Sequence, residues 1–494
     1  MTTLQRNKPA LIRCGVASFI CAIGIIALSG ISDGPLYLVL GGLTFITVSP
    51  FLFSRIDLLK PIYWLSVGFF LHICVRAWLI ALEWGLLRLS SPYLSYRMAL
   101  DLVLPGALIA GIGFICFMLG YFLPFPKDLG ALLRKKTSLI LLPNRRTIIL
   151  LFIIWSVGWI FRIGSILQGG SSFWLNVIRS AYIQPDVVVI GPLELLASIR
   201  RIGFVGLWGF YFQRTNRSVR LSVLCYVMLY IEMLFGIASG LKQFIIEPIL
   251  AVAIAYAIGR PGARIRFRLI AFAGVIFLLA LIWVREYRTQ ALNLGWNATR
   301  GEVLREVLLN GWRDLHLNLQ GILEELANRL VFDNLLLVLA YVPEPIPFAY
   351  GGTFLPQMLT SLIPQLLWRG RSSLGRNFFA ELSGPYVGGT APTLIGDLYF
   401  NFGIVGVFVG MLAVGLIMRT LYEWLASCRR VGIGGVIVFG VLLLRWFDVV
   451  GLGMINVLYP LVRELPIALV VVWLIRDKRS RTSINPGLVS EELR

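Results

Sequence analysis

Long apolar runs separated by short polar connectors dominate this sequence. About twelve runs are long enough to cross the roughly 30 Å hydrocarbon core of a bilayer as α-helices. Arg76 in the third run and Arg200 and Arg201 in the sixth are unusual inside such segments. The pattern predicts an all-α, polytopic integral membrane protein with spans at residues 12–30, 34–53, 61–82, 101–123, 147–166, 195–213, 221–240, 243–259, 269–285, 393–418, 432–450 and 453–475.

The pattern changes between the ninth and tenth spans, in the long segment 286–392. Apolar residues recur there at steps of three, four or seven: Leu304, Leu308, Leu315, Ile322, Leu326 and Leu330. This spacing predicts an amphipathic helix within 302–330, which either packs on the end of the bundle or lies in the membrane interface. The chain then divides into spans one to nine (1–285), a partly helical extracytoplasmic loop (286–392), spans ten to twelve (393–475) and a basic tail (476–494).

Charge gives the orientation. The formal net charge is +20, yet only 14% of the residues are charged. The basic residues gather in alternate connectors and at the two ends, as the positive-inside rule requires, so nucleic-acid binding is excluded as the reason for the charge. We expect both termini in the cytoplasm and the long loop outside it. The first apolar run lacks a cleavage-site pattern and is predicted to be a retained helix.

The cysteine and histidine content argues against a metal site. The six cysteines have no CxxC or other metal-ligand spacing, and the only histidines are His72 and His316. A zinc site or a disulfide framework is therefore not expected. No cofactor is predicted.

Ionisable residues inside the predicted spans are costly and require partners or a function. Two interpretations stay open for them. One is pairing, by which Arg445 and Asp448, three residues apart on one helix, neutralise each other and Glu232 is expected to face a basic group on a neighbouring helix. The other is a cavity that holds an anion. The residues concerned are Arg76, Glu194, Arg200, Arg201, Glu232, Lys242, Glu247, Arg445, Asp448, Arg463 and Glu464.

Arginines also occur in the predicted outer loop, against the orientation bias. Arg285 and Arg288 follow the ninth span, and Arg369, Arg371 and Arg376 lie close together further on. Guanidinium groups match phosphate oxygens bidentately, so a phosphate or diphosphate near the outer surface would explain them. Simple solvation of a surface loop is the alternative.

Several short motifs resemble one known family. In order they are Ala238-Ser239-Gly240-Leu241-Lys242, the Arg285 and Arg288 pair, Tyr350-Gly351-Gly352-Thr353, Ile363-Pro364-Gln365-Leu366-Leu367-Trp368, and Thr390-Ala391-Pro392-Thr393-Leu394-Ile395-Gly396-Asp397-Leu398-Tyr399-Phe400-Asn401-Phe402-Gly403. Their order and spacing over about residues 220–425 resemble the Wzy-type O-antigen and exopolysaccharide repeat-unit polymerases, and also the enterobacterial common antigen polymerases. Lys242 stands where that family usually has Arg, which keeps the charge but loses the fork.

The resemblance implies a GT-C-like membrane glycosyltransferase of the bacterial inner membrane. Such polymerases transfer a glycan chain from undecaprenyl diphosphate onto the next lipid-linked oligosaccharide repeat unit at the outer face. Expected partners are that lipid-linked oligosaccharide, membrane lipids and a chain-length regulator protein, with no nucleic acid. An O-antigen-ligase-like transferase and a flippase or transporter of lipid-linked oligosaccharides are the alternatives.

The resemblance and the charge pattern together nominate site residues. The predicted diphosphate clamp is Lys242, Arg285, Arg288, Arg369 and Arg376. Asp397, Glu381 and His316 are candidates for the catalytic general base, and Tyr386 and Tyr399 for stacking on sugar rings. In similar proteins Ser can occupy the position of Asp397, and His316 also fits a packed or solvated histidine.

Overall fold

The fold is known from a computed structural model, which describes residues 34–53, 57, 59–83, 89, 91, 93–137, 139, 141, 144–167, 193, 196–214, 218–260, 267–294, 300–310, 327–328, 330–360, 392–426, 433–447 and 449–476. Every regular element among these residues is a helix. Seven of the described helices are long and apolar enough to cross a membrane by length and composition, as expected of an integral membrane protein. They are Gly34–Phe51, Pro61–Ala81, Tyr96–Phe122, Arg145–Leu167, Val219–Ser239, Leu394–Ala426 and Ile455–Ile475.

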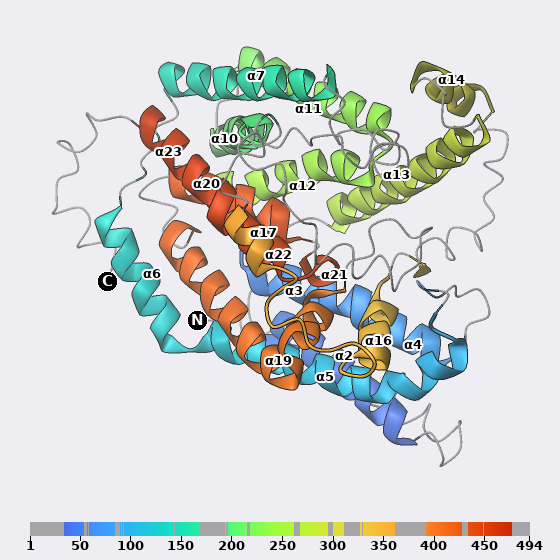
Figure 1. Cartoon of the computed structure of the whole chain (residues 1–494). Coiled ribbons are helices and arrows are strands. Elements are labelled where there is room, and N and C mark those ends of the chain that lie inside the picture. The colour runs from blue at the N-terminus through green and yellow to red at the C-terminus, as the bar shows by residue number, and fades with distance from the viewer. Residues whose placement is uncertain are drawn as a thin grey trace.

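The helices form two groups (Figure 1). The first group contains α2 (Gly34–Phe53), the continuous helix α3–η2–α4 (Pro61–Phe69, Phe70–Val75, Arg76–Ala81), α5 (Tyr96–Phe122), α16 (Phe332–Tyr341) and α19 (Leu394–Leu421), which continues as η3 (Tyr422–Ala426). The second contains α7 (Arg145–Leu167), α10 (Arg200–Gln213), α11 (Val219–Ser239) and α12 (Lys242–Gly259). Helix α20 (Ile433–Trp446) contacts α10 and α12 on one side and α3 and η3 on the other, so it joins the groups.

Glycines set the closest helix contacts. A Cβ atom added at Gly120 of α5 would lie 2.2 Å from the carbonyl oxygen of Leu412 on α19, and one at Gly415 would lie 2.2 Å from that of Phe117. In the second group, a Cβ at Gly203 of α10 would lie 2.4 Å from the carbonyl oxygen of Leu151 on α7. Small residues at these points allow the backbones to approach, which is the usual way that membrane helices pack.

The remaining elements pack on these two groups or between them. They are α6 (Pro124–Lys136), α13 (Phe267–Asn293), α14 (Arg300–Asn310), α17 (Leu355–Thr360), α21 (Val449–Leu452) and the continuous helix α22–η4–α23 (Ile455–Tyr459, Pro460–Glu464, Leu465–Ile475). Eleven of the predicted spans overlap described helices, whereas the first, 12–30, lies outside the described residues. The helix at the ninth span, α13, runs eight residues beyond the predicted end and is not among the seven candidates. Three of the coinciding helices, Gln243–Gly259, Gly434–Trp446 and α10, are shorter than the seven candidates.

The predicted outer loop is partly helical. Helix α14 begins the predicted amphipathic stretch and packs back on α13, where Val303 and Val307 contact Tyr287 and Ala291. Residues 311–326 lie outside the described part of the chain. Helix α16 follows, and its first seven residues are all buried against α5, α19 and α4. This part of the loop therefore belongs to the bundle core.

Candidate functional site

Helix α19 is broken inside the longest motif. Phe402 (φ −142°, ψ 18°) and Gly403 (φ 61°, ψ −152°) leave the helical conformation in the middle of the span. A residue with a Cβ would be strained at the Gly403 backbone angles, so the glycine permits the break. The broken turn exposes backbone groups that need partners inside the protein, because water is scarce at membrane depth.

The turn at residues 350–353 supplies those partners. The amide of Ala349 donates to the carbonyl oxygen of Phe400, and the amide of Tyr350 donates to that of Asn401. Both N–O distances are 3.0 Å. The side-chain oxygen of Asn401 accepts from the amide of Gly351 at 2.8 Å. Two motifs that are about 50 residues apart in the sequence thus bind each other directly, and Asn401 is the residue that joins them.

Asp397 completes this contact, one helical turn before Asn401. Its Oδ1 accepts from the Thr353 hydroxyl at 2.6 Å and from the Asn401 amide at 3.2 Å. Its Oδ2 accepts from the amide of Met454 at 2.8 Å, at the start of α22. Its side chain is 3% exposed, so this carboxylate holds α19, the 350–353 turn and the start of α22 together. We call Asp397, Asn401, Thr353 and Met454 the Asp397 latch.

A second pair of motifs also meets in space. Gly240, in the left-handed conformation (φ 66°), lies directly against the ring of Tyr287: a Cβ there would be 2.4 Å from a ring carbon. The indole of Trp283 donates to the carbonyl oxygen of Ile237 at 3.0 Å. The 238–242 turn therefore packs on the end of α13 that carries Arg285, whose side chain is exposed. Lys242 is the first residue of α12.

The other predicted site residues are placed as follows. Tyr399 is half-buried, with its ring 6.3 Å from that of Phe348, which in turn lies 6.3 Å from that of Tyr350. The backbones of Lys242 and Arg288 are described, but their side chains are not. The predicted residues outside the described part of the chain are Glu381, His316, Arg369, Arg376 and Tyr386.

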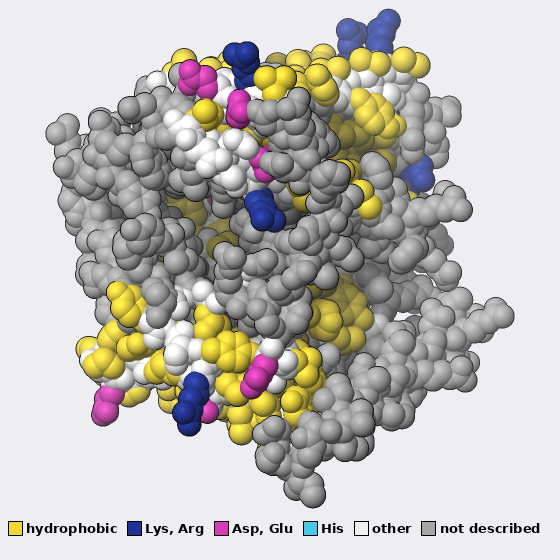
Figure 2. All heavy atoms as spheres, turned by 90° about the vertical axis from the view of Figure 1, so that its right-hand side faces the viewer, with side chains coloured by type: hydrophobic (Ala, Val, Ile, Leu, Met, Phe, Trp, Pro, Cys, Tyr) yellow, Lys and Arg dark blue, Asp and Glu magenta, His cyan; other side chains and the backbone are white. Residues whose placement is uncertain are grey.

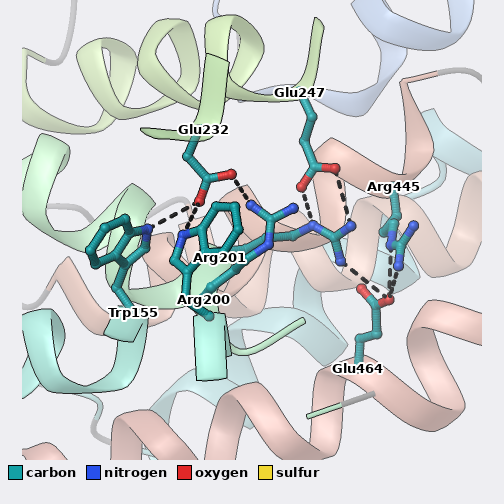
Figure 3. Close-up of polar contacts among 8 residues, drawn as sticks. Trp155, Arg200, Arg201, Glu232, Glu247, Arg445 and Glu464 are labelled. Atoms are coloured by element: carbon teal, nitrogen blue, oxygen red, sulfur yellow. Dashed lines mark hydrogen bonds and ion pairs between the residues drawn. The ribbon is translucent and has the colours of Figure 1, made fainter. Parts of the chain in front are cut away.

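The charged residues within the predicted spans are largely paired (Figure 3). Arg200 donates to Glu232, whose other oxygen accepts from the indoles of Trp155 at 3.0 Å and Trp159 at 3.2 Å. The guanidinium of Arg201 lies on the carboxylate of Glu247 with two hydrogen bonds. The two arginines are consecutive on α10, and they reach α11 and α12 respectively.

A third arginine extends this network to the C-terminal helices. Arg445 binds Glu464 through Nε at 2.8 Å and Nη2 at 2.7 Å, and Arg201 Nη1 lies 3.7 Å from the same Glu464 oxygen. Arg445 therefore pairs with a residue 19 positions away, whereas Asp448, the partner suggested by the sequence, lies outside the described residues. Because three arginines face three glutamates, the set is neutral. We call it the Arg201 network: Arg200, Arg201, Glu232, Glu247, Arg445 and Glu464.

A separate buried pair holds the loop helix α16. Arg76 donates to Asp333 at 2.9 Å and to the carbonyl oxygen of Ala327 at 2.7 Å. Both side chains are almost fully buried. The arginine in the third span thus fixes the start of α16 against the bundle, so these charges favour the pairing interpretation over an anion-holding cavity.

Sequence reasoning did not identify two residues of interest. Asn401 lies within the quoted motif, but nothing in its spacing indicated that its amide would bind a turn about 50 residues earlier. Arg162, buried on α7, stacks on Phe235 and Phe244 at 5.7 and 5.0 Å, next to the 238–242 turn. Among the described residues, no group of three or more His, Cys, Asp or Glu side chains is placed to hold a metal ion.

The end of the molecule that carries α14 and α4 has a mixed surface. Figure 2 shows apolar side chains there with scattered cationic and acidic ones between them. The described residues thus form no single cationic patch on this face, and Arg285 is the one predicted clamp residue whose side chain the structure describes.

Comparison with known proteins assigns no activity. Residues 203–440 match a family model described only as a domain of unknown function (DUF8712). No curated protein and no solved structure matches the chain. The matched segment runs from α10 to α20 and includes both pairs of motifs that meet in space.

Proposed function

We propose that this protein is a glycosyltransferase that polymerises oligosaccharide repeat units carried on undecaprenyl diphosphate. The observation that carries the proposal is the packing of the motifs on which the family resemblance depends. The 350–353 turn binds α19 at its break, and the 238–242 turn packs on α13 beside Arg285. Residues that serve one site are expected to gather in this way, although they are far apart in the sequence.

We also propose the number of spans and their orientation in the membrane. Twelve spans with a GT-C-like arrangement place both termini in the cytoplasm of a bacterium and the 286–392 segment on the outer side of the inner membrane. Basic connectors on the other side support this orientation. The lipid diphosphate then enters from the outer leaflet, where repeat units carried on a lipid are joined.

The proposed reaction depends mainly on stabilising the negative charge of the leaving diphosphate. A hydroxyl of the acceptor unit attacks the anomeric carbon of the chain, the bond from that carbon to the lipid diphosphate breaks, and the hydroxyl proton passes to a base. Lys242, Arg285, Arg288, Arg369 and Arg376 are proposed to bind the leaving diphosphate, since preorganised cations stabilise such charge most effectively. The start of α12 at Lys242 adds the positive end of a helix dipole.

The hydrogen bonds of the Asp397 latch help to decide which residue is the general base. Both Asp397 oxygens already accept hydrogen bonds in a buried position. We therefore assign Asp397 to holding the broken helix, and favour Glu381 or His316 for proton removal. Tyr399 and Tyr386 remain the proposed sugar-stacking residues.

The test uses purified protein in nanodiscs and the lipid-linked units that accumulate in cells from which its gene is deleted. A ladder of longer glycans on the lipid is the expected product. A single transfer to a different acceptor would identify a ligase. Movement of the unit across the bilayer without a new glycosidic bond would identify a flippase, and either result would overturn the proposal.

Arg285→Ala tests the clamp in the same assay. Removing one such donor is expected to lower the polymerisation rate by about 10²-fold or more. The matched control is Arg305→Ala, which removes an exposed arginine from the neighbouring helix α14 and should leave the rate unchanged. Equal rates in the two variants would remove Arg285 from the site.

A further inference from the structure

Helix α6 departs from the direction of α5, the candidate span that precedes it. It follows α5 after a single residue, Leu123, whose extended backbone (φ −54°, ψ 146°) turns the chain, and it starts with Pro124. In Figure 1 it makes a clear angle with α5 and lies beside the C-terminal part of α19 at the edge of the bundle. If α5 crosses the membrane, α6 lies near the plane of one membrane surface.

One side of α6 is fixed to the protein. Gly130 lies close to α19 and η3: a Cβ there would be 2.5 Å from the Glu423 Cβ and 2.7 Å from the Thr420 carbonyl oxygen. Arg134 Nη1 donates to the carbonyl oxygen of Glu423 at 3.3 Å, and the indole of Trp424 donates to the Thr137 hydroxyl at 2.6 Å. These contacts fix the position of α6 relative to the C-terminal end of α19 and to η3.

A second side of α6 is apolar and exposed. Phe125 is 64% and Leu132 is 51% exposed. They are seven residues apart, or about two turns, so they share one face. Phe122 and Leu123 extend this surface from the end of α5, and both are also exposed. Exposed aromatic and aliphatic side chains in a row indicate contact with an apolar medium.

The sides of α6 away from Phe125 are cationic, including the side next to Gly130. Lys127 and Lys135 are exposed, and Arg134 and Lys136 are close to them in the sequence. Asp128 is the one acidic residue in the helix, so α6 carries a net positive charge. Lys127 and Arg134 are also seven residues apart, on a face roughly opposite to that of Phe125.

We propose that α6 is an interfacial helix that binds the head groups of acidic phospholipids. Phe125 and Leu132 enter the acyl region, Lys127 and Lys135 bind head-group phosphates, and the Gly130 side anchors the bundle at that depth. An apolar face with cations on the other sides of the helix fits an anionic membrane surface, whose phosphates lie just outside its acyl region. The inference does not depend on the transferase activity.

Hydrogen exchange of the full-length protein in nanodiscs tests this. The amides of residues 124–136 are followed in phosphatidylcholine alone and with about 30% phosphatidylglycerol. A composition near that value gives the surface a clear negative potential. We expect slower exchange of α6 in the acidic nanodiscs, with α14 unaffected, and loss of the difference at high salt.

The variant Lys127→Gln/Lys135→Gln should reduce this preference for the acidic lipid by about tenfold or more, because each cation near a charged surface adds to binding. The charge-preserving variant Lys127→Arg/Lys135→Arg should retain it, and Arg305→Gln on α14 should have no effect. Equal α6 exchange in both lipid compositions would mean that apolar contacts alone hold the helix. That result, or an unchanged preference in the Gln variant, would overturn the inference.

Discussion

The Arg201 network and the Asp397 latch both bury polar side chains, but in different ways. The network places three arginines against three glutamates from five helical segments, so each charge depends on another. The latch buries one carboxylate, and its partners are a hydroxyl, a side-chain amide and a backbone amide. In the Arg201 network each carboxylate is neutralised by a guanidinium group. In the Asp397 latch the carboxylate is stabilised only by hydrogen bonds from neutral donors.

This difference predicts different sensitivities. Removing one member of a buried ion pair leaves an uncompensated charge in a medium that solvates it poorly. Removing one neutral hydrogen-bond partner leaves the carboxylate with its other hydrogen bonds, so only part of its stabilisation is lost. The network should therefore respond more strongly to single substitutions than the latch, although both are buried.

The largest effect is expected for Arg201→Ala. It leaves Glu247 without its two hydrogen bonds and gives the network a net negative charge. Breaking a buried pair in this way costs about 3–5 kcal/mol, which should lower the thermal unfolding midpoint in detergent substantially. The control is Arg285→Ala, the same substitution at an exposed arginine, with an expected cost below about 0.5 kcal/mol.

Removing both members of an ion pair tests whether the two charges depend on each other. Arg200→Leu/Glu232→Leu takes away both charges at once, so its cost should be smaller than the sum of the two single substitutions. Additive costs, or an Arg201→Ala midpoint equal to that of Arg285→Ala, would show that the pairs do not depend on each other as described.

A smaller effect is expected for Asp397→Asn. The new amide group retains one acceptor but places a donor near the Thr353 hydroxyl or the Met454 amide, at a cost of about 1–3 kcal/mol. No cation is left unpaired, so the midpoint should fall less than in Arg201→Ala. Asp128→Asn on the exposed surface of α6 is the control for the change in charge alone.

The same variant separates two roles of Asp397. If the carboxylate holds the broken helix, unfolding temperature and polymer yield should fall together. A variant as stable as the parent that makes no polymer would instead assign Asp397 the role of general base, and would withdraw the holding role given to it above.

The smallest effect is expected for Thr353→Val. It removes one hydroxyl, while Asp397 retains the Met454 amide and Asn401 retains the Asp397 carbonyl oxygen. The loss should be about 1 kcal/mol in the same unfolding measurement. Thr289→Val, at an exposed threonine on α13, should change the midpoint hardly at all. A Thr353→Val cost as large as that of Arg201→Ala would contradict the comparison.

The sequence by itself determined most of the long helices, but not α6 or α16. Eleven predicted spans overlap described helices because a spanning helix satisfies its own backbone and needs only a local run of apolar residues. One of its two open interpretations paired Glu232 with a basic group on another helix, and the structure shows this pair with Arg200. These inferences require nothing beyond local composition and the cost of an isolated charge.

Only the tertiary structure decided which groups meet. Arg445 pairs with Glu464, and Asn401 binds the amide of Gly351. Gly240 packs on Tyr287, and α16 enters the bundle through Arg76. Such contacts depend on which helices are neighbours and how they are rotated, which no local pattern encodes. The physical reason is that hydropathy gives each segment its depth in the membrane, whereas side-chain packing and charge pairing choose its neighbours.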